Sequence, residues 1–455
     1  MKKRLEVFIS GYQETVEHLY SDDSDGCAKD RRALIRSGYL TMLAQYITAG
    51  AFFTAMLIEM GADETYIGYV TMATTLCMAM QFFAPLFWER RQLRKRLIVW
   101  MEAISSFLTY LGLPLVVILP IATPWKLGLY MALTLISGLL SQFCLPASNV
   151  WIMQIVPLAK RVSYESLTSM VHTVINVVSV FLAGWLVDGI EGCSQTFGSI
   201  SSSMLAILIL RGIAFTAAFI SIICRALRVR EFSYPVTSEK HIRLSMLLEP
   251  IRNRPFLCLI MIPCLWTMIG GIIGNYFSLH LIKNVEMSYT VISFAGFIST
   301  PMILLMTPIW TKVLRRKDWI RTIAWAMLGY CVAYCCNVLI SAHTQFFYFI
   351  AIIVGHLFSP AITMVSNNLI FVYMPKENRT AYFAFRSLML TASGFLGQAF
   401  GTWFVGATEA VQLDLFGISV GNLQLTSALA AILGVVLAGS IFLFRSRLPK
   451  ITDDL

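Results

Sequence analysis

Few ionisable side chains lie inside the long apolar runs of this chain, and each of them could do chemistry there. Four stand out: His172, His356 and Arg211, which lie well inside their runs, and Glu102, which lies at a shallow position in its run. A charge at the centre of a membrane costs about 2.5–3.5 kcal/mol on insertion scales, so such a residue needs a partner or a water-filled cavity. A histidine suits proton exchange near neutral pH, or it serves as a neutral imidazole that bonds a backbone carbonyl. Arg211 could bind an anion or act as a paired support residue.

A larger set of neutral polar side chains shares the same runs. It comprises Gln45, Tyr46, Gln142, Asn149, Asn275, Tyr276, Asn367, Asn368 and Gln398, with Trp151 and Trp266 as aromatic surfaces. Each alone could be a hydrogen bond between helices, worth about 0.6–2 kcal/mol. As a group they favour a solute that has hydrogen-bonding groups and some apolar surface.

The runs that carry these residues have the length of membrane-spanning helices. The chain is 57% hydrophobic and only 13% charged, whereas a soluble chain carries about a quarter charged residues. A span needs about 20 apolar residues. We predict twelve spans, near 34–58, 66–88, 97–119, 126–156, 163–187, 203–225, 256–282, 289–313, 319–341, 345–374, 380–407 and 421–444, with kinks at Pro146 and Pro360.

Basic residues predict the direction of the chain. Almost all of the 35 lysines and arginines fall in segments that share one side of the predicted membrane, which indicates cytoplasmic termini. The net charge of +10 therefore points to anionic lipid at the cytoplasmic face, not to nucleic acid. Residues 1–32 read as a cytoplasmic amphipathic segment and linker. The ten cysteines form no CxxC pair, and we expect no metal and no cofactor.

One stretch of the chain occurs twice. NVWIMQIVPLAKRVSY (149–164) and NNLIFVYMPKENRTAY (367–382) share Asn, Ile, Pro, Arg and Tyr at an offset of 218 residues, and the offset continues to Trp185 and Trp403. The repeat predicts two six-helix halves, 33–225 and 256–444, with a cytoplasmic connection at 226–255 and a tail at 445–455. Such symmetry is typical of transporters that open alternately to either side.

Basic clusters follow the second and the eighth spans, APLFWERRQLRKR (84–96) and TPIWTKVLRRKD (307–318). With this topology, the chain resembles the major facilitator superfamily. The loop signature of that family, G-x-L-x-D-R-x-G-R-R, is degenerate here. Pro85 and Glu89 stand at the Gly and Asp positions, and Arg90, Arg94 and Lys95 supply the basic part.

The resemblance implies an all-α membrane fold of 12 transmembrane helices in two pseudo-symmetric six-helix halves. It also implies a monomeric secondary transporter of a small organic solute, ion- or proton-coupled, in a bacterial plasma membrane. A transport-inactive sensor with the same fold is the alternative. The chain lacks HExxH and GxxxxGK[ST], so we expect neither an enzyme nor direct drive by ATP.

In this family the first, fourth, seventh and tenth spans usually line a central cavity. The resemblance therefore makes His356 a cavity candidate, puts His172 on a neighbouring gating span, and makes Glu102 and Arg211 supporting residues. The four lining spans carry no acid near their middle, which disfavours a strongly cationic substrate.

Two further sets concern motion. Glu89, Arg90, Arg94, Lys95, Arg161 and Arg379 are candidates for cytoplasmic gating loops. Glu89 would pair with a basic residue or a helix terminus as a latch; alternatively, the basic residues only set topology and contact anionic lipid. Glycines cluster at 270, 271 and 274, and at 394, 397 and 401, where they allow helices to slide or to pack tightly.

Overall fold

The structure is a computed structural model, and it describes most of the chain. The described residues are 26–88, 91–156, 158–192, 201–232, 249–274, 276–314, 316, 318–374, 379–415 and 418–444. Most of the expected amphipathic segment therefore lies outside the described residues, as do Glu89, Arg90, Asn275 and much of 226–255. Arg161 and Arg379 belong to described helices, but their side chains are not described.

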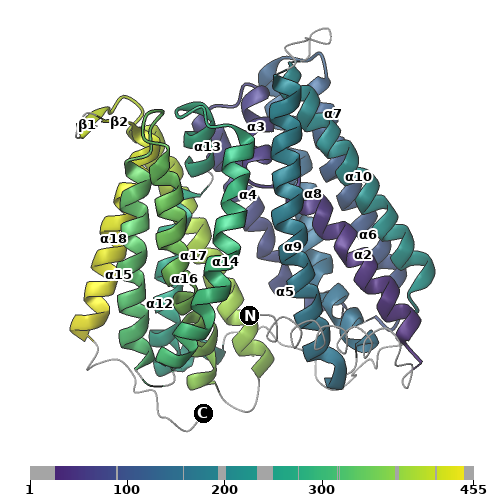
Figure 1. Cartoon of the computed structure of the whole chain (residues 1–455). Helices are drawn as coiled ribbons and strands as arrows, with labels where there is room; N and C mark the ends of the chain where they lie inside the picture. Colours follow the sequence, from purple (N-terminus) through teal and green to yellow (C-terminus); the bar gives the residue numbers. More distant parts are fainter. Residues whose placement is uncertain are drawn as a thin grey trace, which may run out of the picture. The chain divides into compact units, whose positions relative to one another are not determined.

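The first part of the chain is a series of helices (Figure 1). They are α2 (Ala28–Tyr46), α3 (Ala51–Glu59), α4 (Glu64–Met78), α5 (Met80–Trp88), α6 (Lys95–Phe107), the π-helical turn η1 (Leu108–Gly112), α7 (Leu113–Ile118), α8 (Thr123–Ile155), α9 (Leu158–Glu191) and α10 (Ser202–Arg228).

The rest of the chain adds helices and one small hairpin. They are the 3₁₀ turn η2 (Glu249–Arg252), α12 (Arg254–Ile273), α13 (Tyr276–Lys283), α14 (Tyr289–Leu314), α15 (Trp319–Val338), α16 (Phe346–Val372), α17 (Arg379–Ala407), β1 (Leu413–Leu415), β2 (Ile418–Val420) and α18 (Asn422–Phe444). The strands β1 and β2 pair antiparallel, with Leu413 opposite Val420.

The helices confirm the predicted spans. In the described part of the chain, 11 helices are long and apolar enough to cross a membrane, or up to 12 if α2 and α3 are one broken span. Large apolar side chains lie exposed on their outer faces, such as Trp125 at 77% and Leu443 at 79%. Water would penalise this surface and lipid does not, so the protein is a multi-pass integral membrane protein.

Two details differ from the predicted spans. The first span begins at Ala28 and is interrupted between Tyr46 and Ala51. The seventh is interrupted after Ile273. Pro146 and Pro360 lie inside helices α8 and α16, and the kinks expected at these prolines remain a prediction.

Contacts divide the chain into two compact units. Unit 1 contains residues 1–52 and 83–241, and unit 2 contains 53–82 and 242–455. The segment 53–82 joins unit 2 because α4 packs against α17 and α13. The boundaries that the sequence repeat suggests, 33–225 and 256–444, remain a prediction.

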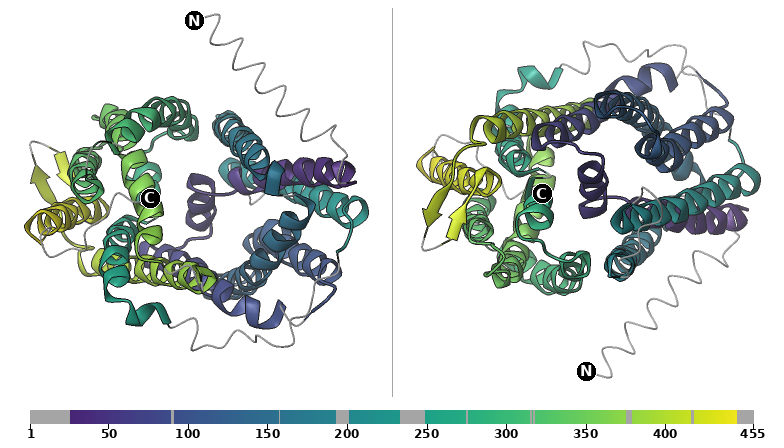
Figure 2. Two further views of the ribbon diagram at one scale, coloured as in Figure 1. Left: turned by 90° about the horizontal axis from the view of Figure 1, so that it is seen from below. Right: turned by 90° about the horizontal axis from the view of Figure 1, so that it is seen from above.

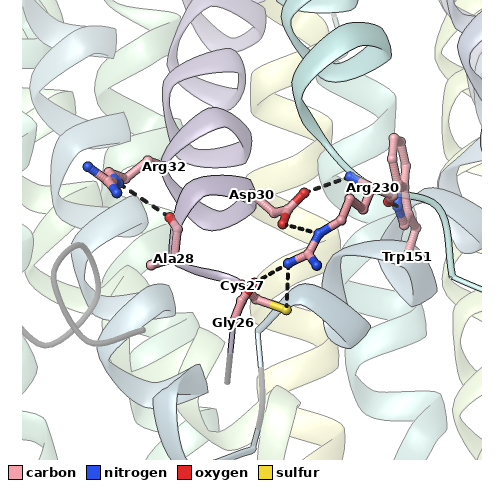
Figure 3. A network of polar contacts seen from close by, with 7 residues as sticks. All are labelled: Gly26, Cys27, Ala28, Asp30, Arg32, Trp151 and Arg230. Atoms are coloured by element: carbon pink, nitrogen blue, oxygen red, sulfur yellow. Dashed lines mark hydrogen bonds and ion pairs between the residues drawn. The ribbon is translucent and has the colours of Figure 1, made fainter. Parts of the chain in front are cut away.

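Unit 1 is organised around α10, which packs against α2, α6 and α9. A second contact set ties the start of α2 to the residues after α10 (Figure 3). The Asp30 carboxylate accepts hydrogen bonds from the backbone N–H of Arg230 at 2.6 Å and from its Nε at 2.8 Å. Trp151 is fully buried and donates its indole N–H to the Arg230 carbonyl at 3.0 Å. Trp151 is thus a packing residue of α8.

Unit 2 is a bundle in which α15 packs against α16 and α18, and α12 packs against α17. Its core contains Ile323, Met327 and Val365. In the end-on views of Figure 2, the green helices of this unit run side by side. Glycines bring α12 and α17 together: a Cβ at Gly397 would lie 2.0 Å from the Met268 carbonyl oxygen, and one at Gly401 would lie 2.4 Å from the Ile272 oxygen. The glycine face of α17 is therefore a close helix contact.

Candidate functional site

The interruption of the seventh span is the first element of the candidate site. Gly274 ends α12 with φ +44° and ψ −133°, a conformation that a residue with a Cβ adopts only with strain. Its N–H donates to the Gly270 carbonyl at 3.3 Å, and the helix restarts as α13 at Tyr276. Non-helical backbone at membrane depth is tolerated only where protein buries it or where it lines a cavity.

A chain of hydrogen bonds joins α13 to α17 at this interruption. The Tyr276 hydroxyl donates to Thr402 Oγ1 at 2.9 Å, and that hydroxyl donates to the Gln398 carbonyl at 2.9 Å. Tyr276 and Thr402 are both buried. In contrast, the side-chain oxygen Oε1 of Gln398 is buried and has no hydrogen-bond partner among the described residues. Such an atom costs about 1–3 kcal/mol while it stays unpaired, so it favours a water or a ligand donor.

A small cavity adjoins these groups. Its volume is about 10 Å³, and residues of α4, α12, α13 and α17 line it, including Thr71, Tyr276, Gln398 and Thr402. This volume is about that of one water probe. Helix α4 comes so near because of Gly68: a Cβ there would lie 2.0 Å from Tyr276 Oη and 2.3 Å from Thr402 Oγ1.

An ion pair links the ends of the same elements. Glu64, the first residue of α4, accepts from Lys283 Nζ at 2.9 Å and from Asn422 Nδ2 at 2.7 Å. The contact connects α4 to α13 and α18. Because the Lys283 side chain is 54% exposed, the pair contributes no more than about 1 kcal/mol. The contacts of Glu64 hold the ends of α4, α13 and α18 together.

Of the predicted substrate residues in unit 2, the structure brings Tyr276 and Gln398 together at one cavity. His356 is half-buried in α16, with Nδ1 2.8 Å from the Ile352 carbonyl oxygen of its own helix. Asn367 is exposed and accepts from Arg386 Nη2 at 2.9 Å.

The predicted substrate residues of unit 1 are spread over three helices. Gln45 of α2 and Asn149 of α8 are exposed, while Tyr46 of α2 and Gln142 of α8 are half-buried. His172 of α9 is half-buried and stacks edge-on against Tyr39, with ring centroids 6.1 Å apart. Nothing in these contacts gathers the five side chains into one site, so their role in binding stays a prediction.

The two residues expected to support the bundle make contacts of that kind. Arg211 is 3% exposed and donates from Nη2 to the Thr48 carbonyl at 3.2 Å. Thr48 follows the end of α2, where the partial negative charge of a helix C-terminus suits a cation. Glu102 pairs with Arg225 at 2.9 Å and joins α6 to α10.

The predicted loop residues are described only in part. Arg94 is buried and donates from Nε to the Arg91 carbonyl at 3.1 Å. The backbone N–H of Lys95, at the start of α6, donates to Glu231 Oε1 at 2.9 Å. Hence the acid seen at this helix start is Glu231, which the sequence did not single out.

Three residues near the predicted ones were missed: Gly68, Thr402 and Arg386. Thr402 follows Gln398 by four residues, so helical spacing places it on the same face, and this signal could have found it. Arg386 reads as one more cytoplasmic basic residue near a span end. Gly68 carries no local signal, because its role depends on a helix that is distant in sequence.

The chain matches the Major Facilitator Superfamily over residues 37–398. Among solved structures, it is similar to the nucleoside transporter NupG, with TM-score 0.66, 12% identity, and coverage of 90% of this chain and 98% of that one. It is also similar to a bacterial homologue of the human lysosomal transporter Spinster, with TM-score 0.64, 14% identity, and coverage of 92% and 96%.

A third similar structure is a bacterial homologue of the iron transporter ferroportin, with TM-score 0.65, 14% identity, and coverage of 90% and 98%. At such identities these likenesses show the fold alone. No curated protein sequence matches the chain. The architecture is therefore the expected one, an all-α membrane fold with two pseudo-symmetric six-helix halves.

Proposed function

Because the chain belongs to the Major Facilitator Superfamily, a family of membrane transporters, we propose that it moves a small polar organic solute by alternating access. The observation that carries this proposal is the interrupted seventh span together with the Gln398 oxygen of α17, which lines the same cavity and has no hydrogen-bond partner among the described residues. Discontinuous helices form the substrate and ion sites of many transporters, because their freed backbone and side-chain groups can bind a ligand at membrane depth.

The chemistry of the site favours hydrogen bonding over charge pairing. Tyr276 and Thr402 present hydroxyls, and Gln398 presents an acceptor, all of them neutral groups. A solute or a water that donates to Gln398 Oε1 would satisfy the buried oxygen and gain about 0.5–1.5 kcal/mol in net terms. The close approach of Gly68 makes α4 sensitive to any change in this cluster.

Proton coupling is the form of energy input that we propose. His356 lies in α16 with Nδ1 bonded to the Ile352 carbonyl of its own helix, and histidine is a side chain that proteins use to shuttle protons. The distribution of lysines and arginines supports cytoplasmic termini in a bacterial plasma membrane. Under this proposal Lys95, half-buried at the start of α6, lies on the cytoplasmic side, where it can contact anionic lipid.

Flux measurements test the proposal. The full chain is reconstituted in liposomes, and the uptake of labelled neutral and anionic solutes, such as nucleosides, sugars and small carboxylates, is followed with and without a pH gradient. We expect at least one solute to enter faster than into protein-free liposomes, and the gradient to change the rate. Zero flux of every solute under every gradient contradicts transport.

One variant links the flux to the site. Gln398→Leu removes the unpaired oxygen, so the thermal unfolding midpoint should stay the same or rise. The initial flux should fall at least about tenfold, because the solute or water loses its acceptor, a step worth about 1.4 kcal/mol. Leu443→Ala, on the exposed face of α18, is the matched control with unchanged flux. A Gln398→Leu protein that transports like the wild type removes this cluster from the mechanism.

A further inference from the structure

An arginine of α17 lies inside a membrane span and makes unusual contacts. Arg386 is half-buried, within the span that runs from Tyr382 to Ala407. Its Nη2 donates to Asn367 Oδ1 at 2.9 Å and to the Ser366 carbonyl at 3.3 Å, both on α16. All these groups belong to unit 2.

The positive charge of Arg386 meets only neutral oxygens in the part of the chain that the structure describes. The ion pairs found there involve Glu102, Asp30 and Glu64, each with another base. Moreover, Nε of Arg386 is buried and has no hydrogen-bond partner among the described residues. Placing a guanidinium in a membrane span without a counter-ion costs free energy. A charged residue at such a position is therefore a candidate for a functional role.

We propose that Arg386 and Asn367 form a binding site for an oxyanion, the carboxylate or phosphate group of the transported solute. The planar guanidinium presents its N–H groups as a fork that matches the two oxygens of such a group. Asn367 adds a further donor to the site. Its Oδ1 accepts a hydrogen bond from Arg386, so its Nδ2 can donate to the same anion. Asn367 is exposed, which gives a ligand access to the pair.

This site is distinct from the cavity at Gln398. Arg386 and Gln398 lie on the same helix, twelve residues apart, which corresponds to about 18 Å along the axis. A small solute therefore does not contact both residues at once, and Arg386 would hold the anion at a different stage of its passage. The assignment to the transported solute rests on the proposed transport function, whereas the binding of an oxyanion does not.

Binding in detergent micelles tests the site without transport. Thermal unfolding of the full chain is measured at constant ionic strength against sodium phosphate, sodium benzoate and the uncharged analogue benzamide. We expect the two anions, but not benzamide, to raise the unfolding midpoint of the wild type. Arg386→Gln should need at least about ten times more anion for the same shift, since hydrogen bonds to charged groups are the strong ones.

Matched variants separate the site from general charge. Arg386→Lys keeps the charge without the fork and should lie between wild type and Arg386→Gln. Arg321→Gln removes an exposed arginine at the start of α15 and should respond like the wild type. An identical anion response in the wild type and Arg386→Gln overturns the proposal.

A second variant keeps the test decisive if Arg386→Gln does not fold. Asn367→Asp supplies an internal carboxylate to the guanidinium. It should raise the unfolding midpoint in the absence of anion and abolish the shift by phosphate and benzoate. An Asn367→Asp protein that still responds to both anions as the wild type does overturns the proposal.

Lipid and transport arms identify the source of the anion. In nanodiscs of neutral lipid, soluble anions should still raise the unfolding midpoint of the wild type. If Arg386 affects the midpoint only in nanodiscs of anionic lipid, Arg386 is a contact of lipid headgroups and the proposal is overturned. In liposomes, benzoate or other carboxylates should compete with solute flux in the wild type and compete more weakly in Arg386→Lys. Flux of neutral solutes alone overturns the assignment of an oxyanion solute and leaves the transport function intact. Anion binding without flux of any solute supports the oxyanion site and contradicts the transport function.

Discussion

Helices α9 and α17 occupy the same place in the two sequence repeats, yet they differ in their chemistry. Trp185 and Trp403, which match at the 218-residue offset, are 65% and 64% exposed, so both helices present the same outer face. In contrast, the positions that match Gln398 and Thr402 of α17 are Val180 and Gly184 in α9. The polar pair Gln398 and Thr402 therefore has no polar counterpart at the matching positions of α9.

The repeats also differ at the contact between Asn367 and Arg386. Asn367 of α16 has a matching asparagine, Asn149 of α8, but the position that matches Arg386 of α17 is Thr168 of α9. The Thr168 hydroxyl donates to the Tyr164 carbonyl of its own helix at 2.7 Å, while Arg386 reaches across to α16. The two repeats therefore agree in their exposed apolar residues, such as Trp185 and Trp403, and they differ at the residues of the candidate sites, Gln398, Thr402 and Arg386.

The glycine contact of α17 should give the largest effect. Positions matching Gly394, Gly397 and Gly401 are Asn176, Ser179 and Ala183 in α9, so α9 has no glycine at these three positions. Gly397→Ala places a Cβ against the Met268 carbonyl and should cost about 1–3 kcal/mol of stability. Thermal unfolding in detergent measures the loss.

Two controls complete this test. Gly406→Ala, on the same helix with open space around it, should leave the unfolding midpoint unchanged or slightly raised, because alanine favours a helix. Ser179→Ala should have little effect in α9. Equal stability of Gly397→Ala and wild type would mean that α12 and α17 can separate without loss.

Much of the framework can be predicted from sequence. Apolar runs of membrane length identify the spans, because a bilayer imposes a fixed length on each helix. The spacing of Gly394, Gly397 and Gly401 correctly predicts one face of α17 made for close packing. Tyr276 and Gln398 were both selected, since polar residues in apolar runs are few and need a partner or a cavity.

The rest depends on tertiary neighbours that a sequence does not reveal. Gly270, Gly271 and Gly274 looked alike, but only Gly274 of the three has a positive φ and interrupts the span. Arg386 was counted as a topology residue, because a basic residue near a span end has that role by default. Its contact with Asn367 depends on the packing of α16 beside α17.

The asparagine pair should give a smaller effect. Asn367→Leu removes the acceptor of Arg386 Nη2 in an exposed hydrogen bond and should destabilise the protein by about 0.5–1.5 kcal/mol without anion, or by less in phosphate. Asn149→Leu, at the matching position of α8, should change stability by about 0.5 kcal/mol at most. The two unfolding midpoints are compared in the same detergent. Equal losses would mean that the repeats are alike here and would remove the contrast drawn at Arg386.

The smallest effect is expected where the two repeats agree. Trp185→Leu and Trp403→Leu each replace one exposed apolar side chain with another, so lipid solvates both variants and stability should change by less than about 0.5 kcal/mol. Unfolding in detergent and in nanodiscs measures both. A loss confined to Trp403 would show that the outer face of α17 contacts another protein surface. The two repeats would then differ in their exposed apolar faces as well as in their polar sites.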